Sequence, residues 1–218
     1  MTELHMCCRR FLGEAPRFFR KRLEAQLALF ERVAGVPGGI VELGVGSGVS
    51  LRGWLHLVAE HGQGRTIWGY DTFAGFPRLL PEDGPEAPAL GKRVGGETEC
   101  RDRPVTCQEV EASLPAHAGV RVELVAGDIV ETLRAPRRPL ALVFCDADTY
   151  APTKAALDLL WPHLAPGGLI VFDEYGQEPW PGETRAVDEW LAANPGQPLE
   201  RLSMESGPEA LVVKRRGK

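Results

Sequence analysis

The sequence predicts an α/β fold of three layers, in which helices cover both faces of a mostly parallel sheet. Short apolar runs of strand length alternate with longer segments in which apolar residues recur every three or four positions. A glycine-rich loop follows the first of these runs, and acidic side chains follow later ones. We find no internal repeat and no second core, so the 218 residues are predicted to form a single domain, 1–218.

The elements of this fold follow in chain order. Apolar residues recur on one face of residues 17–34, between Pro16 and Gly35, and predict an amphipathic helix within an N-terminal helical extension, 1–36. This helix would pack on the domain, join a second subunit in a homo-oligomer, or lie on a membrane surface. Strands are then predicted within residues 38–48 and at 65–71, 120–125, 140–144, 169–172 and 208–215. Helices are predicted at 51–59, 105–117, 149–164 and 183–193, with a short helical run up to Leu133.

The first strand turns into a loop with glycine at Gly44, Gly46 and Gly48, and Glu42 lies two residues before the first of them. Glycine lets the backbone approach a ligand closely and take positive φ. A dinucleotide fingerprint needs its third glycine one position later, where this chain has Val49. The observed spacing is that of class I S-adenosylmethionine methyltransferases, with an ordinary strand-to-helix turn as the alternative.

Two single acids follow the next strands. Asp71 ends the strand at 65–71, about twenty residues after the glycine loop, where an acid can accept hydrogen bonds from the ribose hydroxyls of an adenosine cofactor. It could instead cap the turn that follows. Asp128 follows the strand at 120–125, and would either cap the next helix or bind the adenine side of the cofactor.

Two buried runs each end in a pair of acids. Asp146 and Asp148 follow one run, and Asp173 and Glu174 follow the next. Neighbouring parallel strands place their carboxyl ends on one edge of the sheet, where ligands bind. Four carboxylates there would repel one another and take up protons unless a positive charge lay among them. The pattern therefore predicts a divalent cation with oxygen ligands, with helix capping and surface ion pairs as the alternative.

Residues 74–104 are rich in proline and glycine. An irregular segment of this length inside a compact domain is usually a lid, a binding loop or partly disordered. We predict a lid over the substrate, although its charged residues could equally form a solvated surface.

The composition limits the partners. A net charge of -5 argues against nucleic acid or an anionic membrane surface as the main partner, because both require a basic field. No apolar run approaches the ~18 residues that a membrane span needs, and no export signal is apparent. The cysteines form no Cys-x-x-Cys pair. These features predict a cytoplasmic protein with free thiols that acts on a small molecule.

Taken together, these residues resemble the macrocin O-methyltransferase family, metal-dependent enzymes that methylate sugar hydroxyls on macrolide and aminocoumarin antibiotics. The resemblance covers residues 41–190. Its motifs are Val-Glu-Leu-Gly-Val at 41–45, Tyr-Asp-Thr-Phe-Ala-Gly-Phe-Pro at 70–77, Asp-Ala-Asp-Thr-Tyr at 146–150, Thr-Lys-Ala-Ala-Leu at 153–157, Pro-Gly-Gly at 166–168 and Arg-Ala-Val-Asp at 185–188. It implies a Rossmann-like class I methyltransferase fold with a seven-stranded sheet.

The resemblance also implies the cofactors and the site. S-adenosylmethionine would be bound by Glu42, Gly44, Gly46, Ser47, Ser50, Asp71, Thr72, Asp128 and Asp146. Mg²⁺ would be bound by Asp146, Asp173 and Glu174, the last standing where the family usually has aspartate, and Asp148 would be the catalytic base. The acceptor would be a hydroxyl of a small molecule, in particular a sugar of a natural product in antibiotic biosynthesis.

Methyl transfer to such a hydroxyl needs an oxygen nucleophile in line with the sulfonium methyl group. A metal ion could bind two neighbouring acceptor oxygens and lower the pKa of one, and Asp148 would take its proton. Three alternatives remain open at this stage. They are a catechol-type O-methyltransferase, an S-adenosylmethionine-binding module without turnover, and a nicotinamide-dependent oxidoreductase, which would share the sheet but not the acid cluster.

Overall fold

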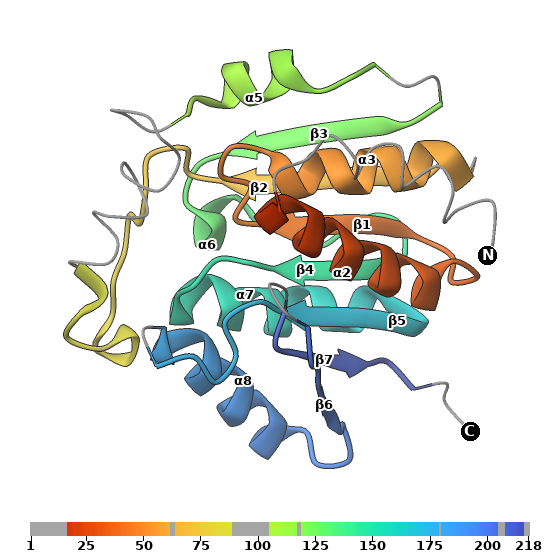
Figure 1. Ribbon diagram of the computed structural model, residues 1–218. Coiled ribbons are helices and arrows are strands. Elements are labelled where there is room, and N and C mark those ends of the chain that lie inside the picture. The colour runs from red at the N-terminus through yellow and green to blue at the C-terminus, as the bar shows by residue number, and fades with distance from the viewer. Residues whose placement is uncertain are drawn as a thin grey trace.

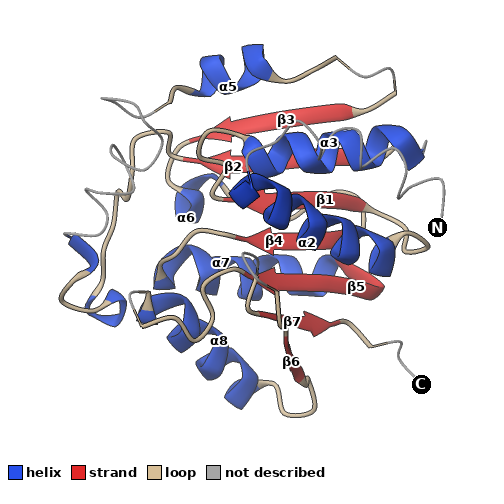
Figure 2. Cartoon of the chain, in the orientation of Figure 1, coloured by secondary structure: helices blue, strands red, loops and turns tan. Residues whose placement is uncertain are grey.

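The chain forms one seven-stranded sheet with the strand order β3-β2-β1-β4-β5-β7-β6 (Figures 1 and 2). A computed structural model describes residues 17–61, 64–88, 105–116, 119–178, 180–204 and 208–215. The strands are β1 (Gly39–Leu43), β2 (Thr66–Asp71), β3 (Arg121–Ala126), β4 (Leu140–Cys145), β5 (Leu164–Phe172), β6 (Leu199–Arg201) and β7 (Ala210–Val213). Strands β1 to β5 pair in parallel, and β7 runs antiparallel to both of its neighbours. The predicted mostly parallel, seven-stranded sheet is confirmed.

Helices cover both faces of this sheet, which confirms the three layers (Figure 1). The helices are α2 (Arg17–Val33), α3 (Val49–His61), α5 (Cys107–Ser113), α6 (Ile129–Thr132), α7 (Tyr150–Leu160) and α8 (Pro181–Ala193), with short 3₁₀ turns η1 (Pro81–Asp83) and η2 (Trp161–His163). Helices α2 and α3 lie on one face, and α7 and α8 on the other.

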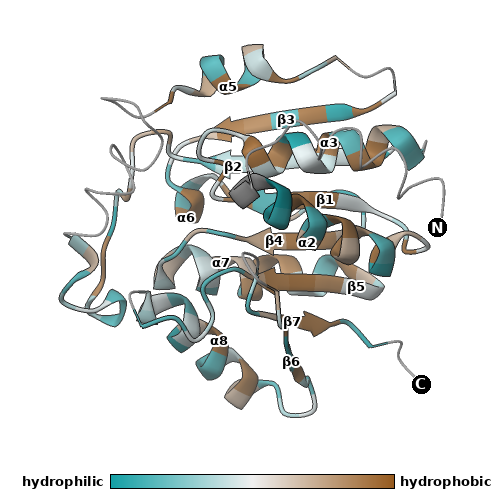
Figure 3. Cartoon of the chain, viewed as in Figure 1, coloured by the Kyte–Doolittle hydropathy of each residue, from teal (hydrophilic) through white to brown (hydrophobic). Residues whose placement is uncertain are grey.

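Strand β4 is apolar along its length (Figure 3). Its six residues are all buried, and the apolar core lies on both sides of it. Successive side chains of a strand point to opposite faces. Accordingly, Leu142 packs in one cluster with Phe30 and Trp54, whereas Val143 packs in a second cluster with Leu157. The sequence prediction of a strand buried on both faces is therefore confirmed.

The apolar face of helix α2 packs against the rest of the domain. Leu23, Leu27 and Phe30 are buried in the core cluster shared with α3 and the sheet. Arg65 donates hydrogen bonds to the carbonyls of Val33 (2.8 Å) and Ala34 (3.2 Å), and so adds a donor for the carbonyls at the end of the helix. Of the predicted N-terminal extension, residues 1–16 lie outside the described residues.

Two element predictions need correction. The helix predicted to reach Leu164 ends at Leu160, and Leu164 already belongs to β5, where it pairs with Leu140. The pairing then shifts before Leu169, so the Pro-Gly-Gly sequence lies in an irregular part of the strand rather than beyond a helix. The short strand β6 was not predicted, because its three residues are only partly buried or exposed and carry no alternating pattern.

The predicted lid is described as far as residue 88. Residues 74–88, here called the covering segment, include η1 and run past the C-terminal ends of the parallel strands (Figure 1). The rest of the predicted lid, 89–104, lies outside the described residues. Within the part of the chain that is described, no helix is both long enough and apolar enough to cross a membrane.

Candidate active site

A cavity of about 300 Å³ opens at the C-terminal edge of the sheet. Its walls come from α2, the glycine loop after β1, the end of β2, the covering segment and the turns after β3 and β4. They include Arg22, Gly44, Gly46, Ser47, Ser50, Asp71, Thr72, Phe76, Asp128, Asp146 and Asp148. The fold thus places a cavity at the edge where ligands bind in open parallel sheets.

The glycine loop is shaped by two sterically required glycines. Gly44 has a φ of 86°, and a side chain on it would overlap the carbonyl oxygen of Asp146. Gly48 has a φ of 77°, and a Cβ there would lie 2.7 Å from a methyl group of Val110. Both the positive φ and the lack of space favour glycine at these positions. The loop can therefore run close to β4 and leave room for a ligand.

Asp71 faces the cavity from the end of β2, and its carboxylate is held by main-chain donors. One oxygen accepts a hydrogen bond from the backbone N–H of Gly46 (2.8 Å), and the other from that of Phe73 (2.7 Å). The neighbouring Thr72 hydroxyl donates to the carbonyl of Gly75 (2.5 Å). Each carboxylate oxygen can accept more than one hydrogen bond, so Asp71 retains acceptor capacity toward the cavity.

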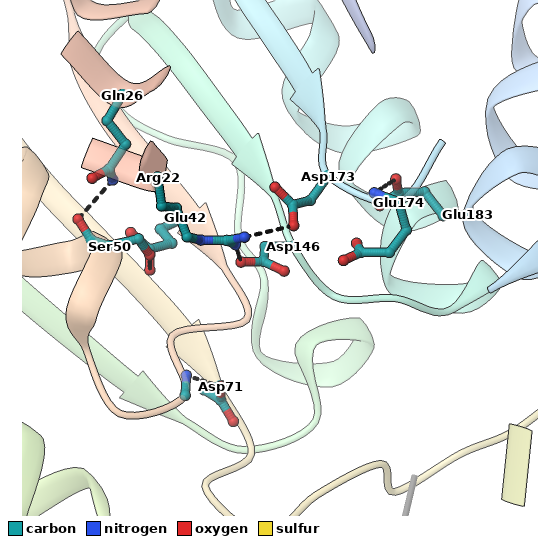
Figure 4. Close-up of polar contacts among 10 residues, drawn as sticks. Arg22, Gln26, Glu42, Ser50, Asp71, Asp146, Asp173, Glu174 and Glu183 are labelled. Carbon is teal, nitrogen blue, oxygen red and sulfur yellow. Dashed lines mark hydrogen bonds and ion pairs between the residues drawn. The ribbon is translucent and has the colours of Figure 1, made fainter. Parts of the chain in front are cut away.

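Glu42 lies behind the glycine loop rather than in the cavity wall. It is fully buried, and one of its oxygens accepts a hydrogen bond from the hydroxyl of Ser50 (2.5 Å). Among the described residues its other oxygen has no partner. Burial raises the pKa of Glu42 to about 8, against the opposing effect of the Ser50 hydrogen bond. Gln26 holds the same stretch by donating to the carbonyl of Ser50 (2.8 Å; Figure 4). Cofactor contact by Glu42 remains a prediction.

On the other side of the cavity, an arginine lies among the predicted metal ligands. Arg22 of α2 donates to a carboxylate oxygen of Asp173 (2.9 Å) and forms an ion pair with Asp146 (Figure 4). The side chains are 16% exposed for Arg22 and 7% for Asp173. Burial opposes the charge of the guanidinium, but the two carboxylates outweigh this effect and raise the pKa of Arg22. Arg22 was not predicted to be part of the site.

Three carboxylates converge beside this ion pair. One oxygen from each of Asp146, Asp148 and Glu174 lies within 4.8 Å of the others. Burial, reinforced by the charge of Asp173, raises the pKa of Asp148 to about 7. Burial also raises the pKa values of Asp146 and Glu174 well above their ordinary range. Within the described residues, buried oxygens of Asp173 and Glu174 have no hydrogen-bond partner.

This arrangement fits a divalent cation, because hard cations are bound by carboxylate oxygens and the ion would supply the missing partner. The predicted ligand set and the observed group share Asp146 and Glu174. They differ in the third member: Asp173 was predicted, whereas the converging oxygens include Asp148. Asp173 is instead next to Arg22.

Glu183, the third residue of α8, supports the cluster from behind. It is fully buried and accepts a hydrogen bond from the backbone N–H of Glu174 (2.8 Å; Figure 4). Burial raises its pKa well above the ordinary range, and the charge of Asp173 adds to this effect. No sequence pattern indicates this role, because an acid in the first turn of a helix is common.

Asp128 was predicted either to cap the next helix or to bind the adenine side of the cofactor. It caps α6 by accepting a hydrogen bond from the backbone N–H of Val130 (2.9 Å). It also lines the cavity and forms an ion pair with Arg78 of the covering segment (3.3 Å). Capping is confirmed, and adenine binding remains a prediction.

The predicted site residues are thus brought to one edge of the sheet but not all into the cavity wall. Those that line the cavity are Gly44, Gly46, Ser47, Ser50, Asp71, Thr72, Asp128, Asp146 and Asp148. Glu42, Asp173 and Glu174 are not among the residues that line it. The residues that were missed are Arg22, Asp83 and Glu183, which contact the site from α2, the covering segment and α8.

The sequence pattern of the family described as Macrocin-O-methyltransferase (TylF) matches residues 18–203. The chain belongs to this family. The predicted resemblance is therefore confirmed, and the family match extends beyond it at both ends, to include α2 and β6.

Curated members of the family are similar to the chain over part of their length. A mycinamicin III 3''-O-methyltransferase of Micromonospora griseorubida is 31% identical over 147 residues, which are 65% of this chain and 56% of that protein. A demethyldecarbamoylnovobiocin O-methyltransferase of Streptomyces niveus is 32% identical over 180 residues, which are 79% of this chain and 66% of that protein. The match thus spans little more than half of the first relative and about two thirds of the second.

Solved structures share the fold over nearly the whole chain. The O-methyltransferase NovP superposes with a TM-score of 0.72 at 25% identity, covering 97% of both chains. The calicheamicin methyltransferase CalS11 superposes with a TM-score of 0.66 at 29% identity, covering 97% of this chain and 91% of that one. These neighbours confirm the class I methyltransferase fold that the sequence predicts.

Proposed function

We propose that this chain transfers the methyl group of S-adenosylmethionine to a sugar hydroxyl of a small natural product, with the help of a divalent cation. The observation that carries the proposal is the convergence of Asp146, Asp148 and Glu174 beside a glycine-loop cavity, in a chain of this family. The names of its relatives support the acceptor class. One acts on a rhamnosyl group of a tetracenomycin, and another is a TDP-rhamnose 3'-O-methyltransferase.

The cofactor would occupy the half of the cavity nearest the glycine loop. Gly44, Gly46 and Ser47 of the loop and Ser50 at the start of α3 would hold its amino-acid end, because all four line this part of the cavity. Asp71 would accept hydrogen bonds from the ribose hydroxyls, since main-chain donors already fix its orientation. Thr72 and Asp128 line the adjoining wall, on the side proposed for the adenine.

A magnesium ion fits the acid half of the cavity. Asp146 and Glu174 would bind it, together with Asp173 or Asp148. When bound, the ion would orient two neighbouring oxygens of the acceptor and favour ionisation of one of them. Arg22 would meanwhile hold Asp146 and Asp173 in place through its ion pairs.

Asp148 is the proposed base. Its carboxylate lines the cavity and would accept the proton of the acceptor hydroxyl as the oxygen attacks the methyl group. A pKa of about 7 suits this task, because such a group is largely ionised just above neutral pH and still basic enough to take a proton. S-adenosylmethionine supplies an activated methyl group, so alignment of the two reactants would contribute much of the rate.

The test is methyl transfer from labelled S-adenosylmethionine to two rhamnosylated acceptors, TDP-rhamnose and a rhamnosylated natural product, with catechol as the rival acceptor. We expect transfer to a rhamnoside, a loss of at least about tenfold in chelator and recovery on addition of Mg²⁺. Undiminished activity in chelator would contradict the metal. Preference for catechol would favour the catechol-type alternative.

A binding measurement separates the remaining alternatives. S-adenosylhomocysteine should bind in a calorimeter, and NAD should not, because Val49 replaces the fingerprint glycine. Cofactor binding without transfer to any acceptor of the panel would favour a binding module. A homo-oligomer through the N-terminal helix also stays a proposal, and the apolar face of α2 offers it little, since Leu23, Leu27 and Phe30 are buried within the chain.

A further inference from the structure

One buried carboxylate of the covering segment reaches the turn that carries the proposed base. Asp83, the last residue of η1, is only 2% exposed. One of its oxygens accepts a hydrogen bond from the backbone N–H of Leu80 (2.7 Å), within its own segment. The other accepts one from the backbone N–H of Tyr150 (2.6 Å), the first residue of α7. Asp83 therefore joins two segments that are far apart in the sequence.

The bond to Tyr150 gives the start of α7 an acceptor from outside the helix. The first N–H groups of a helix have no partner within it, and the side chain just before the helix often accepts from the second or third of them. Here that residue is Thr149, which forms no such cap and whose hydroxyl donates to the carbonyl of Ala147 (3.0 Å). The carboxylate of Asp83 accepts from the first N–H group, in a place where the helix dipole favours negative charge.

The capped residue directly follows a strained turn. Asp148 lies two residues before Tyr150 and has a φ of 59°, in the left-handed region that side chains other than glycine rarely adopt. The backbone N–H of Thr149 closes the turn by donating to the carbonyl of Ala147 (2.6 Å). A conformation of this kind persists only where its surroundings hold it. The contact of Asp83 with Tyr150 fixes one end of this turn.

The start of α8 holds Asp83 in this position. A side chain on Gly182 would overlap a carboxylate oxygen of Asp83 and lie 2.7 Å from the backbone nitrogen of Tyr150. Glu183, the next residue, accepts the hydrogen bond from the N–H of Glu174. The first turn of α8 therefore contacts both the Asp83–Tyr150 hydrogen bond and, through Glu183, the backbone of Glu174 on the acid side of the cavity.

We propose that Asp83 is a positioning residue, which holds Asp148 in its reactive orientation and couples it to the covering segment. The inference rests on the proposed function. Residues 74–78 of the same segment line the cavity, and Phe76 lies against Trp180 just before α8, with ring centroids 5.4 Å apart. An acceptor bound against this wall would thus contact the same segment whose Asp83 fixes the turn that carries the base.

The test compares Asp83→Asn with Glu82→Gln. In Asp83 each of the two N–H groups is received by a different carboxylate oxygen. An asparagine replaces one of these oxygens by an NH₂ group, which is a donor, so one of the two N–H groups would face a donor and lose its acceptor. Glu82 is the adjacent acid, but its only described ion pair is a long, partly exposed one with Arg185 (3.8 Å). We expect Asp83→Asn to lower kcat by about 10–100-fold, because small displacements of a catalytic group have effects of this size. Glu82→Gln should keep the wild-type kcat.

A split of the kinetic constants distinguishes positioning from general loosening. In Asp83→Asn the Kd for S-adenosylhomocysteine and the KM for the acceptor should stay within about threefold of wild type, since the contacts with both ligands are retained. Amide exchange at Tyr150 should accelerate about tenfold or more, and should not change in Glu82→Gln. The proposal would be overturned by an unchanged kcat. It would also be overturned if kcat/KM fell only because KM rose.

A second variant keeps the carboxylate and displaces it. Gly182→Ala introduces a methyl group where an oxygen of Asp83 now lies, and should lower kcat in the same selective way. If Gly182→Ala retains the wild-type kcat while Tyr150 exchanges faster, the positioning role is refuted. Failure of the proposed function gives a different result: the wild-type protein would transfer no methyl group, while the difference in Tyr150 exchange between the Asp83 and Glu82 variants would persist.

Discussion

The two halves of the cavity differ in how their carboxylates are satisfied. On the glycine-loop side, Asp71 receives two main-chain hydrogen bonds and Glu42 receives one from Ser50. On the acid side, Asp146 and Asp173 share the guanidinium of Arg22, and burial raises the pKa values of Asp146, Asp148 and Glu174 together. The first half is organised by the fold itself, whereas the second carries more negative charge than the described residues compensate.

This difference suggests how the two ligands are recruited. A site whose acceptors are already oriented can bind a cofactor with little rearrangement, which favours affinity. A site of mutually repelling carboxylates gains most from a cation, because the ion removes the repulsion and replaces the protons that they would otherwise hold. We therefore expect changes on the acid side to have the larger consequences for both turnover and stability.

The largest expected effect is that of Asp148→Asn on turnover. The amide cannot accept the hydroxyl proton as a base, so kcat should fall by about 10²–10⁴-fold. Binding of S-adenosylhomocysteine should be retained, because Asp71 and the glycine loop are untouched. Single-turnover kinetics and calorimetry together measure both quantities.

Metal affinity of the same variant decides which acid completes the ion site. If Asp148 acts only as a base, Asp148→Asn should bind Mg²⁺ or Mn²⁺ nearly as well as wild type, and Asp173→Asn should bind it more weakly. The opposite result would assign the third ligand to Asp148, in agreement with the convergence of its oxygen with those of Asp146 and Glu174. Undiminished kcat in Asp148→Asn would rule it out as the base.

Replacement of Arg22 should have the next largest effect, on stability. Arg22→Met leaves Asp146 and Asp173 without their buried partner, and breaking such a pair typically destabilises a protein by about 3 kcal/mol. The matched control is Arg32→Met on the same helix, where the ion pair with Glu200 is 36% and 47% exposed and should contribute less than about 1 kcal/mol.

Urea unfolding of both variants, with and without Mg²⁺, makes the measurement. Magnesium should restore part of the stability lost in Arg22→Met, since it neutralises the same carboxylates. It should stabilise Arg32→Met no more than it stabilises the wild type. Equal losses in the two variants would mean that the acid half does not depend on Arg22 for its charge balance.

The sequence revealed the sheet well because its central strands carry an unambiguous signal. β4 is apolar throughout and buried on both faces, and the strand predicted at 140–144 differs from the observed Leu140–Cys145 by one residue. The limits of β5 could not be read in this way. Pro166 and the glycines after it usually end an element, but here a shift in strand pairing accommodates them. Pairing with β4 thus outweighs the local tendency of proline and glycine to end a strand.

The site was predictable where function depends on local sequence, and not where it depends on packing. The glycine spacing and the acids at strand ends revealed most of the cavity wall. Arg22 was not recognised because its partners are 124 and 151 residues away, and a basic residue on an amphipathic helix usually faces solvent. Asp83 likewise lies in a segment that reads as loop, and only the folded chain brings it to Tyr150.

The smallest expected effect, counted per pH unit, lies on the glycine-loop side, in the pH dependence of stability. In the folded chain burial raises the pKa of Glu42 to about 8 from the reference value of 4.5, so between these values the folded state holds a proton that the unfolded state has released. The contribution of Glu42 to stability is thus fully present below about pH 4.5, and is lost as the pH rises toward 8. At most, one such group changes the free energy of unfolding by about 1.4 kcal/mol per pH unit.

Glu42→Gln removes this titration, so the decline in stability between pH 5 and 8 should be shallower than in wild type, as measured by urea unfolding at several pH values. The control is Glu24→Gln, whose side chain is 49% exposed and whose loss should leave the slope unchanged. Because Glu42 belongs to the half organised by the fold, its effect should be the same with and without Mg²⁺. A change in slope that appears only when Mg²⁺ is absent would instead show that Glu42 titrates as part of the acid half, and that the two halves are one electrostatic unit.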